Sequence, residues 1–183
     1  MTYDRTRIEQ QFRAKAKLKF VFFWGHQPSK DGRLTAACFS QWWPAPFKVD
    51  GVIYPTAEHW MMAGKALLFG DEEAAARIRE ASSPKQVKEF GRQVRGFDDV
   101  RWSAARLDIV TAGNLEKFRQ NPALADFLLS TGTSVLVEAS PVDRIWGIGL
   151  AADDERAANP LQWRGENLLG FALMEVRDRL AKV

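Results

Sequence analysis

The segment from residue 54 to residue 69, YPTAEHWMMAGKALLF, limits most strongly how this chain can fold. As an α-helix it is apolar on nearly every side, which is typical of a helix buried inside a protein. It nevertheless carries Glu58, His59 and Lys65. Burying a charged side chain is costly unless the charge is paired or faces a polar cavity. The segment therefore predicts a buried helix with a specific use for its charged residues.

Helical geometry places Glu58 and Lys65 on one stripe of this segment, because an α-helix turns by about 100° per residue. They lie two turns apart, roughly 10 Å along the axis, which leaves room for a sugar between them. The alternative interpretation is structural. The helix dipole favours an acid such as Glu58 in the first turn, and a lysine can extend its amine to solvent. His59 points to another side, and we interpret it as a structural histidine.

Composition limits the class of protein. A chain of 183 residues predicts one domain, and the single cysteine excludes an internal disulfide and a cysteine-based metal cluster. Much of the net charge of +3 lies in the first 20 residues. We interpret residues 1–19 as a mobile, solvated basic leader, with a nucleic-acid-binding arm as the alternative, and residues 20–183 as the domain. The leader has no apolar core like that of a signal peptide, and no apolar run approaches the length of a membrane span. We therefore expect a cytoplasmic protein with no membrane partner.

Helical patterns dominate the rest of the chain. Capping signals mark several helix ends, for example Ser83 followed by Pro84. The Asp50-Gly51 pair is typical of a tight β-hairpin. The predicted helices span residues 54–69, 71–81, 83–94, 97–121, 122–132 and 167–180, and the predicted short strands span residues 20–25, 47–49, 52–54 and 134–140. These patterns favour a mainly helical single domain with a few short strands.

Two loops carry further candidate residues. In SPVDRIWGIGL, Asp143 precedes Trp146 and Gly147, and glycine lets a backbone approach a ligand closely. In QWRGENLLG, Trp163 and Asn167 stand at the start of the last helix. Asn167 is either the N-cap of that helix or part of an anion site at its N-terminus.

Several enzyme classes have no motif here. The chain contains neither GxGxxG nor GxxxxGK[ST], so Rossmann and P-loop nucleotide binding lose support. Its two histidines, His26 and His59, give a metal site or a Ser-His-Asp triad little to build on. We expect an enzyme that uses no metal and no nicotinamide or other cofactor.

The order of motifs resembles that of one family. The motifs are VDG-x-x-Y-x-x-x-EH-x-x-x-x-x-K, LVE-x-S-P-x-D-x-x-WG-x-G and W-x-G-x-N-x-LG. Over about residues 20–180 the chain resembles the NADAR family, the YbiA-like proteins. The resemblance implies a compact, mainly helical fold and N-glycosidase activity. Known substrates in the family are ribosylaminopyrimidine phosphates of the riboflavin pathway and ADP-ribose attached to guanine. One departure is Gln41, where the family usually has an asparagine, so the amide has a different reach.

For this chemistry we assign hypothetical roles around one pentose pocket. Glu58 stabilises the ribosyl cation or activates water, Asp143 is the second carboxyl group, and Lys65 is an acid, a phosphate ligand or an imine-forming amine. The substrate-binding candidates are Arg92 and Lys117 for phosphate, Trp102, Trp146 and Trp163 for stacking on the base, Gly147 for close approach, and Asn167 for sugar hydroxyls. A binding module without turnover and a helical interaction protein are the non-enzymatic alternatives. The sequence predicts no particular oligomeric state.

Overall fold

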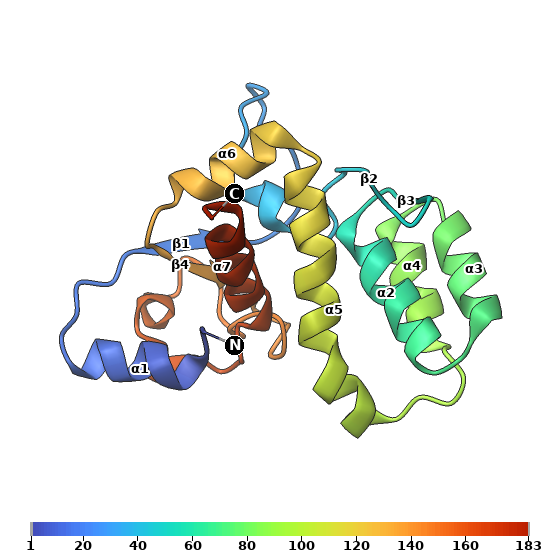
Figure 1. Cartoon of the computed structure of the whole chain (residues 1–183). Helices are drawn as coiled ribbons and strands as arrows, with labels where there is room; N and C mark the ends of the chain where they lie inside the picture. Colours follow the sequence, from blue (N-terminus) through green and yellow to red (C-terminus); the bar gives the residue numbers. More distant parts are fainter. Residues whose placement is uncertain (1, 183) are drawn as a thin grey trace. The chain divides into compact units, whose positions relative to one another are not determined.

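The computed structural model describes residues 2–182, which fold into two compact units. Unit 1 contains residues 2–40 and 122–182, and unit 2 contains residues 41–121. The described residues form seven α-helices and only short strands, which confirms the prediction of a mainly helical fold (Figure 1). No helix within this described range combines the length and the apolar character needed to cross a membrane.

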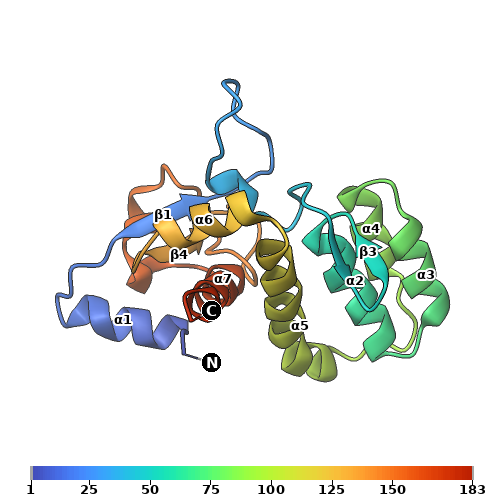
Figure 2. The ribbon, with the colours of Figure 1, turned by 45° about the horizontal axis from the view of Figure 1, so that its top comes forward.

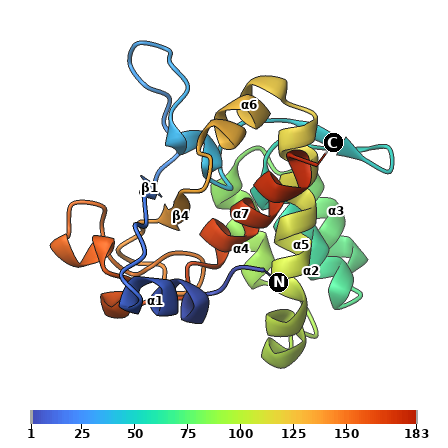
Figure 3. The ribbon, with the colours of Figure 1, turned by 60° about the vertical axis from the view of Figure 1, so that its left-hand side comes forward.

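Unit 1 is organised around two parallel strands. Strand β1 (Phe20–Phe23) pairs with β4 (Val135–Glu138) in register along their whole length. Helix α7 (Leu168–Leu180) packs on β4, and α6 (Pro122–Ser130) contacts α7 (Figure 3). Three short 3₁₀ helices complete the unit: η1 (Ala36–Phe39), η2 (Glu155–Ala158) and η3 (Pro160–Gln162).

The N-terminal residues of unit 1 differ from the solvated leader that composition predicts. Helix α1 (Arg5–Arg13) begins after Asp4, whose side chain caps it. Its residue Ile8 is buried, and the hydroxyl of Tyr3 donates to the Asp178 carboxylate at 2.7 Å. The prediction of a mobile leader is therefore wrong, because a buried isoleucine and a hydrogen-bonded tyrosine hold this segment against the rest of unit 1.

Unit 2 begins with a β-hairpin that the sequence predicts correctly. Strand β2 (Phe47–Val49) pairs antiparallel with β3 (Val52–Tyr54). Asp50 and Gly51 between them both have positive φ, at 48° and 84°. A two-residue turn of this kind matches the right-handed twist of the strands that it joins.

The helices of unit 2 gather around α2, which contacts α3, α4 and α5 (Figure 2). Ser83 caps α4 and Pro84 occupies its first turn, as the sequence predicts. The predicted segments 71–81 and 97–121 form helices with ends shifted by one or two residues. The bounds are α2 (Ala57–Leu68), α3 (Glu72–Glu80), α4 (Pro84–Arg92) and α5 (Asp99–Arg119).

Two glycines allow α2 and α5 to pack closely. A Cβ atom on Gly113 of α5 would lie 2.2 Å from the Trp60 ring, and one on Gly64 of α2 would lie 2.8 Å from the Ile109 side chain. The indole N–H of Trp60 donates to the Ile109 carbonyl at 2.7 Å. The buried N–H therefore has its partner, and the relative placement of the two helices is fixed.

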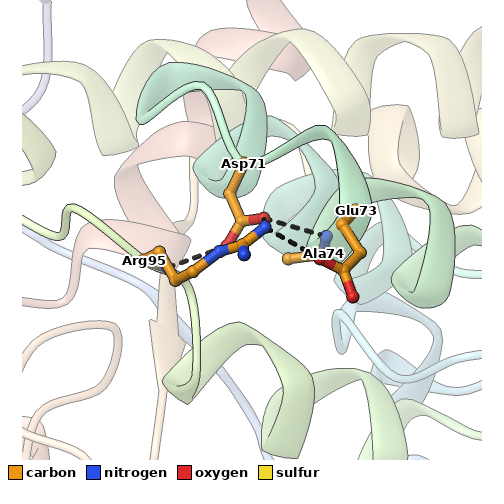
Figure 4. A network of polar contacts seen from close by, with 4 residues as sticks. All are labelled: Asp71, Glu73, Ala74 and Arg95. Atoms are coloured by element: carbon orange, nitrogen blue, oxygen red, sulfur yellow. Dashed lines mark hydrogen bonds and ion pairs between the residues drawn. The ribbon is translucent and has the colours of Figure 1, made fainter.

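An aspartate joins α3 to the loop after α4. The Asp71 carboxylate accepts hydrogen bonds from the guanidinium and backbone N–H of Arg95 and from the backbone N–H of Ala74 (Figure 4). The guanidinium also donates to Glu73 at 2.9 Å. The hydrogen bonds from the Arg95 side chain are the main cause that holds the pKa of Asp71 well below its usual range.

We expect Asp71→Asn to lower the urea midpoint of unfolding at neutral pH, because asparagine still caps α3 but loses the charged partner of Arg95. A carboxyl pKa that is lowered on folding stabilises the folded state above the unfolded pKa, near 3.8. That stabilisation is lost as the pH falls from this value towards the lower folded pKa. The difference between wild type and variant should therefore shrink below about pH 4.

Urea midpoints measured between about pH 3 and pH 7 check this expectation. Glu72→Gln changes an exposed acid in the first turn of the same helix and is the matched control. A midpoint difference for Asp71→Asn that stays constant or grows towards low pH would contradict the assignment.

Candidate functional site

Thr56 and His59 fix the beginning of α2. The Thr56 hydroxyl accepts the backbone N–H of His59 and lies 2.8 Å from Nδ1 of its ring. The Nε2 atom of the ring lies 3.1 Å from the Ala81 carbonyl, which can only accept, so Nε2 carries the proton. Desolvation by burial lowers the pKa of His59, and the ring is neutral. His59 thus has the structural place that its side of the helix predicts.

Glu58 lies in the first turn of α2 and is 3% exposed. Its backbone N–H donates to the Gln41 carbonyl at 3.0 Å. This bond uses one of the amide groups that a helix N-terminus leaves without an intrahelical partner. The bond holds the backbone of Gln41, in the segment before the β-hairpin, against the backbone of the residue that carries the carboxyl group.

Gln41 and Asn114 form an amide pair inside unit 2. The Nδ2 atom of Asn114 donates to Oε1 of Gln41 at 2.7 Å and to the Val110 carbonyl at 2.9 Å. The Oδ1 atom of Asn114 is buried and has no hydrogen-bond partner. Gln41 is 7% exposed and Asn114 is 0% exposed. The pair links α5 to the segment that precedes the hairpin.

Lys117 lies three residues after Asn114 and therefore on the same face of α5. It is 0% exposed, and its amine lies 5.1 Å from the centre of the Phe118 ring. We use the name buried polar cluster for Gln41, Glu58, Asn114 and Lys117. It comprises one acidic, one basic and two amide side chains, all buried. A charge on the acidic or the basic side chain is costly there without compensation.

Lys65 has different surroundings from Glu58, although both belong to α2. Its amine donates to the Gly91 carbonyl at 2.7 Å and lies 4.4 Å from the Phe97 ring centre and 5.8 Å from the Trp102 ring centre. Burial lowers the pKa of Lys65. The predicted common stripe exists, but the amine is directed to the end of α4 and to aromatic rings.

Two other predicted residues lie near this end of α4. Trp102 is buried in the first turn of α5, and its ring faces the amine of Lys65. Arg92 closes α4 and is exposed. Their predicted roles in stacking and in phosphate binding stay predictions.

Asp143 organises its own loop in unit 1. One oxygen of its carboxylate accepts the backbone N–H groups of Ile145 and Trp146, both at 2.8 Å. Its backbone N–H donates to the Ser140 hydroxyl at 3.1 Å. The carboxyl group is therefore held in one orientation, and the partly exposed Trp146 is held beside it.

Gly147 is surrounded closely by protein. A Cβ atom at this position would lie 2.8 Å from the Glu138 carbonyl and 3.1 Å from the Asp143 carbonyl. The Gly147 carbonyl in turn lies 2.2 Å from where Gly165 would carry its Cβ. Tight packing of three backbone segments is thus sufficient to require glycine at this position.

Trp163 and Asn167 also have structural partners. Trp163 is buried, and its indole N–H donates to the Ala157 carbonyl at 2.8 Å. Asn167 stands at the N-cap position of α7 but makes no side-chain cap. Its amide instead donates to the Leu136 carbonyl and accepts the Glu138 N–H, which ties α7 to β4. The predicted N-cap position is therefore confirmed, although the side chain of Asn167 does not cap the helix. Its proposed contacts with substrate stay predictions.

Sequence reasoning missed Asn114. The available signal was an asparagine three residues before Lys117 within a long helix, where asparagine is an unfavourable helix former. Its partner Gln41 is 73 positions away, and no local pattern predicts a pairing over that distance.

Comparison with known proteins identifies the family to which the chain belongs. The NADAR domain model matches residues 22–181. The protein named N-glycosidase R617 of Acanthamoeba polyphaga mimivirus is 46% identical over 165 residues, which are 87% of this chain and 95% of that protein. A maize protein named Riboflavin biosynthesis protein PYRR, chloroplastic, is 33% identical over 138 residues, or 72% of this chain and 20% of that protein.

The E. coli protein YbiA gives both a sequence and a structural match. The protein named N-glycosidase YbiA is 34% identical over 143 residues, which are 78% of this chain and 79% of that protein. The NMR structure of YbiA has a TM-score of 0.71 and covers 90% of this chain and 86% of its own, at 30% identity. Because the domain model and these relatives each cover most of the chain, this protein belongs to the NADAR family.

Proposed function

We propose that this chain hydrolyses the ribose C–N bond of ribosylaminopyrimidine 5′-phosphates, the reactive intermediates of riboflavin synthesis. The coarser statement, a hydrolase acting on N-glycosyl bonds, agrees with the names of the mimivirus and E. coli relatives, of which it covers 95% and 79%. The name of the maize relative supports the riboflavin substrate, although this chain corresponds to only 20% of that protein.

The observation that carries the proposal is the burial of Glu58 in the buried polar cluster. Breaking a bond between C1 of ribose and nitrogen leaves positive charge on C1 and on the ring oxygen. A carboxylate removed from bulk water stabilises such a charge more strongly than an exposed one, because the local dielectric constant is lower. The helix and the Gln41 carbonyl hold Glu58 in place before the reaction begins.

The reaction balances with the groups that this chain supplies. The electrons of the C1–N bond go to the leaving nitrogen, which takes a proton from an acid, and water adds to C1 and loses a proton to a base. The products are ribose 5-phosphate and the free aminopyrimidine. We assign Glu58 to the cation or the water and Asp143 to the second carboxyl role, as in other glycosidases with two carboxyl groups.

Binding roles follow from charge and exposure. Arg92 is exposed and offers its guanidinium to the phosphate, and Lys117 adds a positive charge within the buried polar cluster. Trp146 is the tryptophan of the glycine-rich loop that remains partly exposed for stacking on the base. Trp102 and Trp163 are more enclosed, and stacking on the base stays a prediction for both.

Product analysis by mass spectrometry tests the reaction class and the substrate together. The wild-type protein is incubated with ribosylaminopyrimidine 5′-phosphate, with a panel of stable nucleosides and nucleotides, and with DNA that carries ADP-ribose on guanine. Release of the aminopyrimidine supports the proposal. Release of ADP-ribose alone would assign the chain to the second substrate class, and ligand binding without release would make it a binding module.

We expect Glu58→Gln to reduce kcat by at least about 100-fold with the fold intact, because glutamine keeps the shape but neither balances a cation nor accepts a proton. The initial rate of base release measures the loss, and the thermal midpoint checks the fold. Glu116→Gln changes a mostly buried glutamate on α5 that pairs with Arg119, and it is the matched control. Activity of Glu58→Gln equal to wild type would remove Glu58 from the mechanism.

The lowered pKa of Lys65 gives the imine route a specific test. An uncharged amine can attack C1 of the ring-opened N-riboside and expel the aminopyrimidine, which takes a proton from an acid. The lysine imine that remains is hydrolysed by water to ribose 5-phosphate, or reduced by borohydride to a stable amine. If Lys65 is the nucleophile, borohydride added during turnover should attach the pentose phosphate to the peptide that contains it. Lys65→Arg should abolish the adduct. Full inactivation of Lys65→Arg with no adduct on the wild type would leave Lys65 as an acid or phosphate ligand.

A further inference from the structure

The amide orientation of Asn114 is fixed by its own helix. Its Nδ2 atom lies 2.9 Å from the Val110 carbonyl, which can only accept a hydrogen bond. Turning the amide over would place Oδ1 against that carbonyl, and two acceptors would then face each other without a proton. The Nδ2 atom must therefore also be the one that faces Gln41.

The orientation of Gln41 follows from that of Asn114. Because Nδ2 of Asn114 donates to Gln41 at 2.7 Å, the facing atom of Gln41 is its acceptor, Oε1. Its donor, Nε2, is directed to the other side, where its hydrogen-bond partner among residues 2–182 is the Met61 sulfur at 4.0 Å. A thioether is a weak acceptor, so both N–H groups of Gln41 retain most of their capacity to donate.

Leaving polar groups unsatisfied inside a protein has a cost. A buried donor or acceptor without a partner destabilises a fold by roughly 1–3 kcal/mol. The amide pair of unit 2 holds one such atom, Oδ1 of Asn114, and one donor, Nε2 of Gln41, whose acceptor is only the weak sulfur of Met61. If Gln41 and Asn114 served only to join α5 to the segment before the β-hairpin, a donor without a strong acceptor would not stabilise the fold. A ligand with an acceptor oxygen would give Nε2 of Gln41 a hydrogen-bond partner and so offset this destabilisation.

The position of Gln41 connects this donor with the chemistry. Its carbonyl accepts the backbone N–H of Glu58, so the two residues are adjacent across the start of α2. Glu58 and Met61 share a face of α2 because they are three residues apart. The donor of Gln41 therefore lies on the face of α2 that carries the proposed catalytic carboxylate.

We propose that Gln41 determines substrate choice by donating a hydrogen bond from Nε2 to an acceptor oxygen of the N-riboside. Asn114 is a positioning residue that keeps this donor turned towards the substrate. The inference rests on the proposed function, because it names the group that reads the substrate at the same site. It assigns no proton transfer to either residue.

The first variant is Gln41→Glu, which replaces the donor by an acceptor of nearly equal size. Asn114 still donates to the near oxygen, so the far oxygen then faces the substrate and repels its acceptor. We expect kcat/KM for the preferred N-riboside to fall by about 10-fold or more, mainly through KM, since an unmatched buried acceptor is costly. Gln10→Glu makes the same exchange on the exposed side of α1 and should leave kcat/KM unchanged.

The second variant is Asn114→Asp, which removes the Nδ2 donor with little change of shape. Because it also sets an acceptor against the Val110 carbonyl, its thermal midpoint is measured first. The Gln41 amide must then turn over to donate to the new carboxylate, and its acceptor faces the substrate. We expect a loss of kcat/KM similar to that of Gln41→Glu. A Gln41→Met/Asn114→Leu double variant, which brings no two carboxyl groups together, should lose about as much as Gln41→Met alone. Losses that do not add indicate that Asn114 acts through Gln41, which a purely structural role would not produce.

The controls distinguish failure of the proposed N-glycosidase function from failure of the role assigned to Gln41. If wild-type protein releases no base from any N-riboside, the proposed function fails and this inference fails with it. If wild type is active and folded Gln41→Glu and Asn114→Asp keep kcat/KM within about twofold, the inference alone is overturned. Should either variant lose its cooperative melting transition, Gln41→Asn keeps the donor but shortens its reach. It should change the ratio of kcat/KM between a pyrimidine riboside and a purine riboside, and an unchanged ratio overturns the inference.

Discussion

The close packing of α2 against α5 is the constraint on which unit 2 depends. Gly113 leaves room for the Trp60 ring, and the Trp60 indole bonds to the backbone of α5. With this contact in place, most apolar side chains of α2 are buried or half-buried and its first turn is held in position. The placement of Glu58 and of the amide pair of Gln41 and Asn114 follows from that position. The catalytic hypothesis is thus a consequence of helix packing.

Local signals predicted most of the fold. The Asp50-Gly51 turn, the Ser83 cap and the apolar periodicity each act within a few residues, so the sequence alone shows them. Helix α1 was missed because most of its residues are charged or polar. Its single buried side chain, Ile8, finds its place only through tertiary contacts. The division of the chain into two compact units also depends on contacts between distant segments, and the expected boundary after residue 19 stays a prediction.

The candidate site was predictable in part. The apolar surroundings of Glu58 in the sequence correctly predicted its burial, and the motif order predicted the family. Trp163 and Asn167 show the limit of such reasoning. Each stands in a motif that suits ligand binding, yet its polar atoms bond to the protein backbone. The pairing of Gln41 with Asn114 could not be predicted, because it joins residues that only the packing of α5 brings together.

The central hypothesis is that C–N cleavage takes place at the Glu58 carboxylate. A crystal structure of the protein with ribose 5-phosphate tests it most directly. We expect C1 of the sugar to lie beside the Glu58 carboxylate, within hydrogen-bond reach or one water away. We also expect Gln41 to donate a hydrogen bond to an oxygen of the ligand. A sugar phosphate bound with its C1 remote from Glu58, in protein that remains active in the crystal, would contradict the claim.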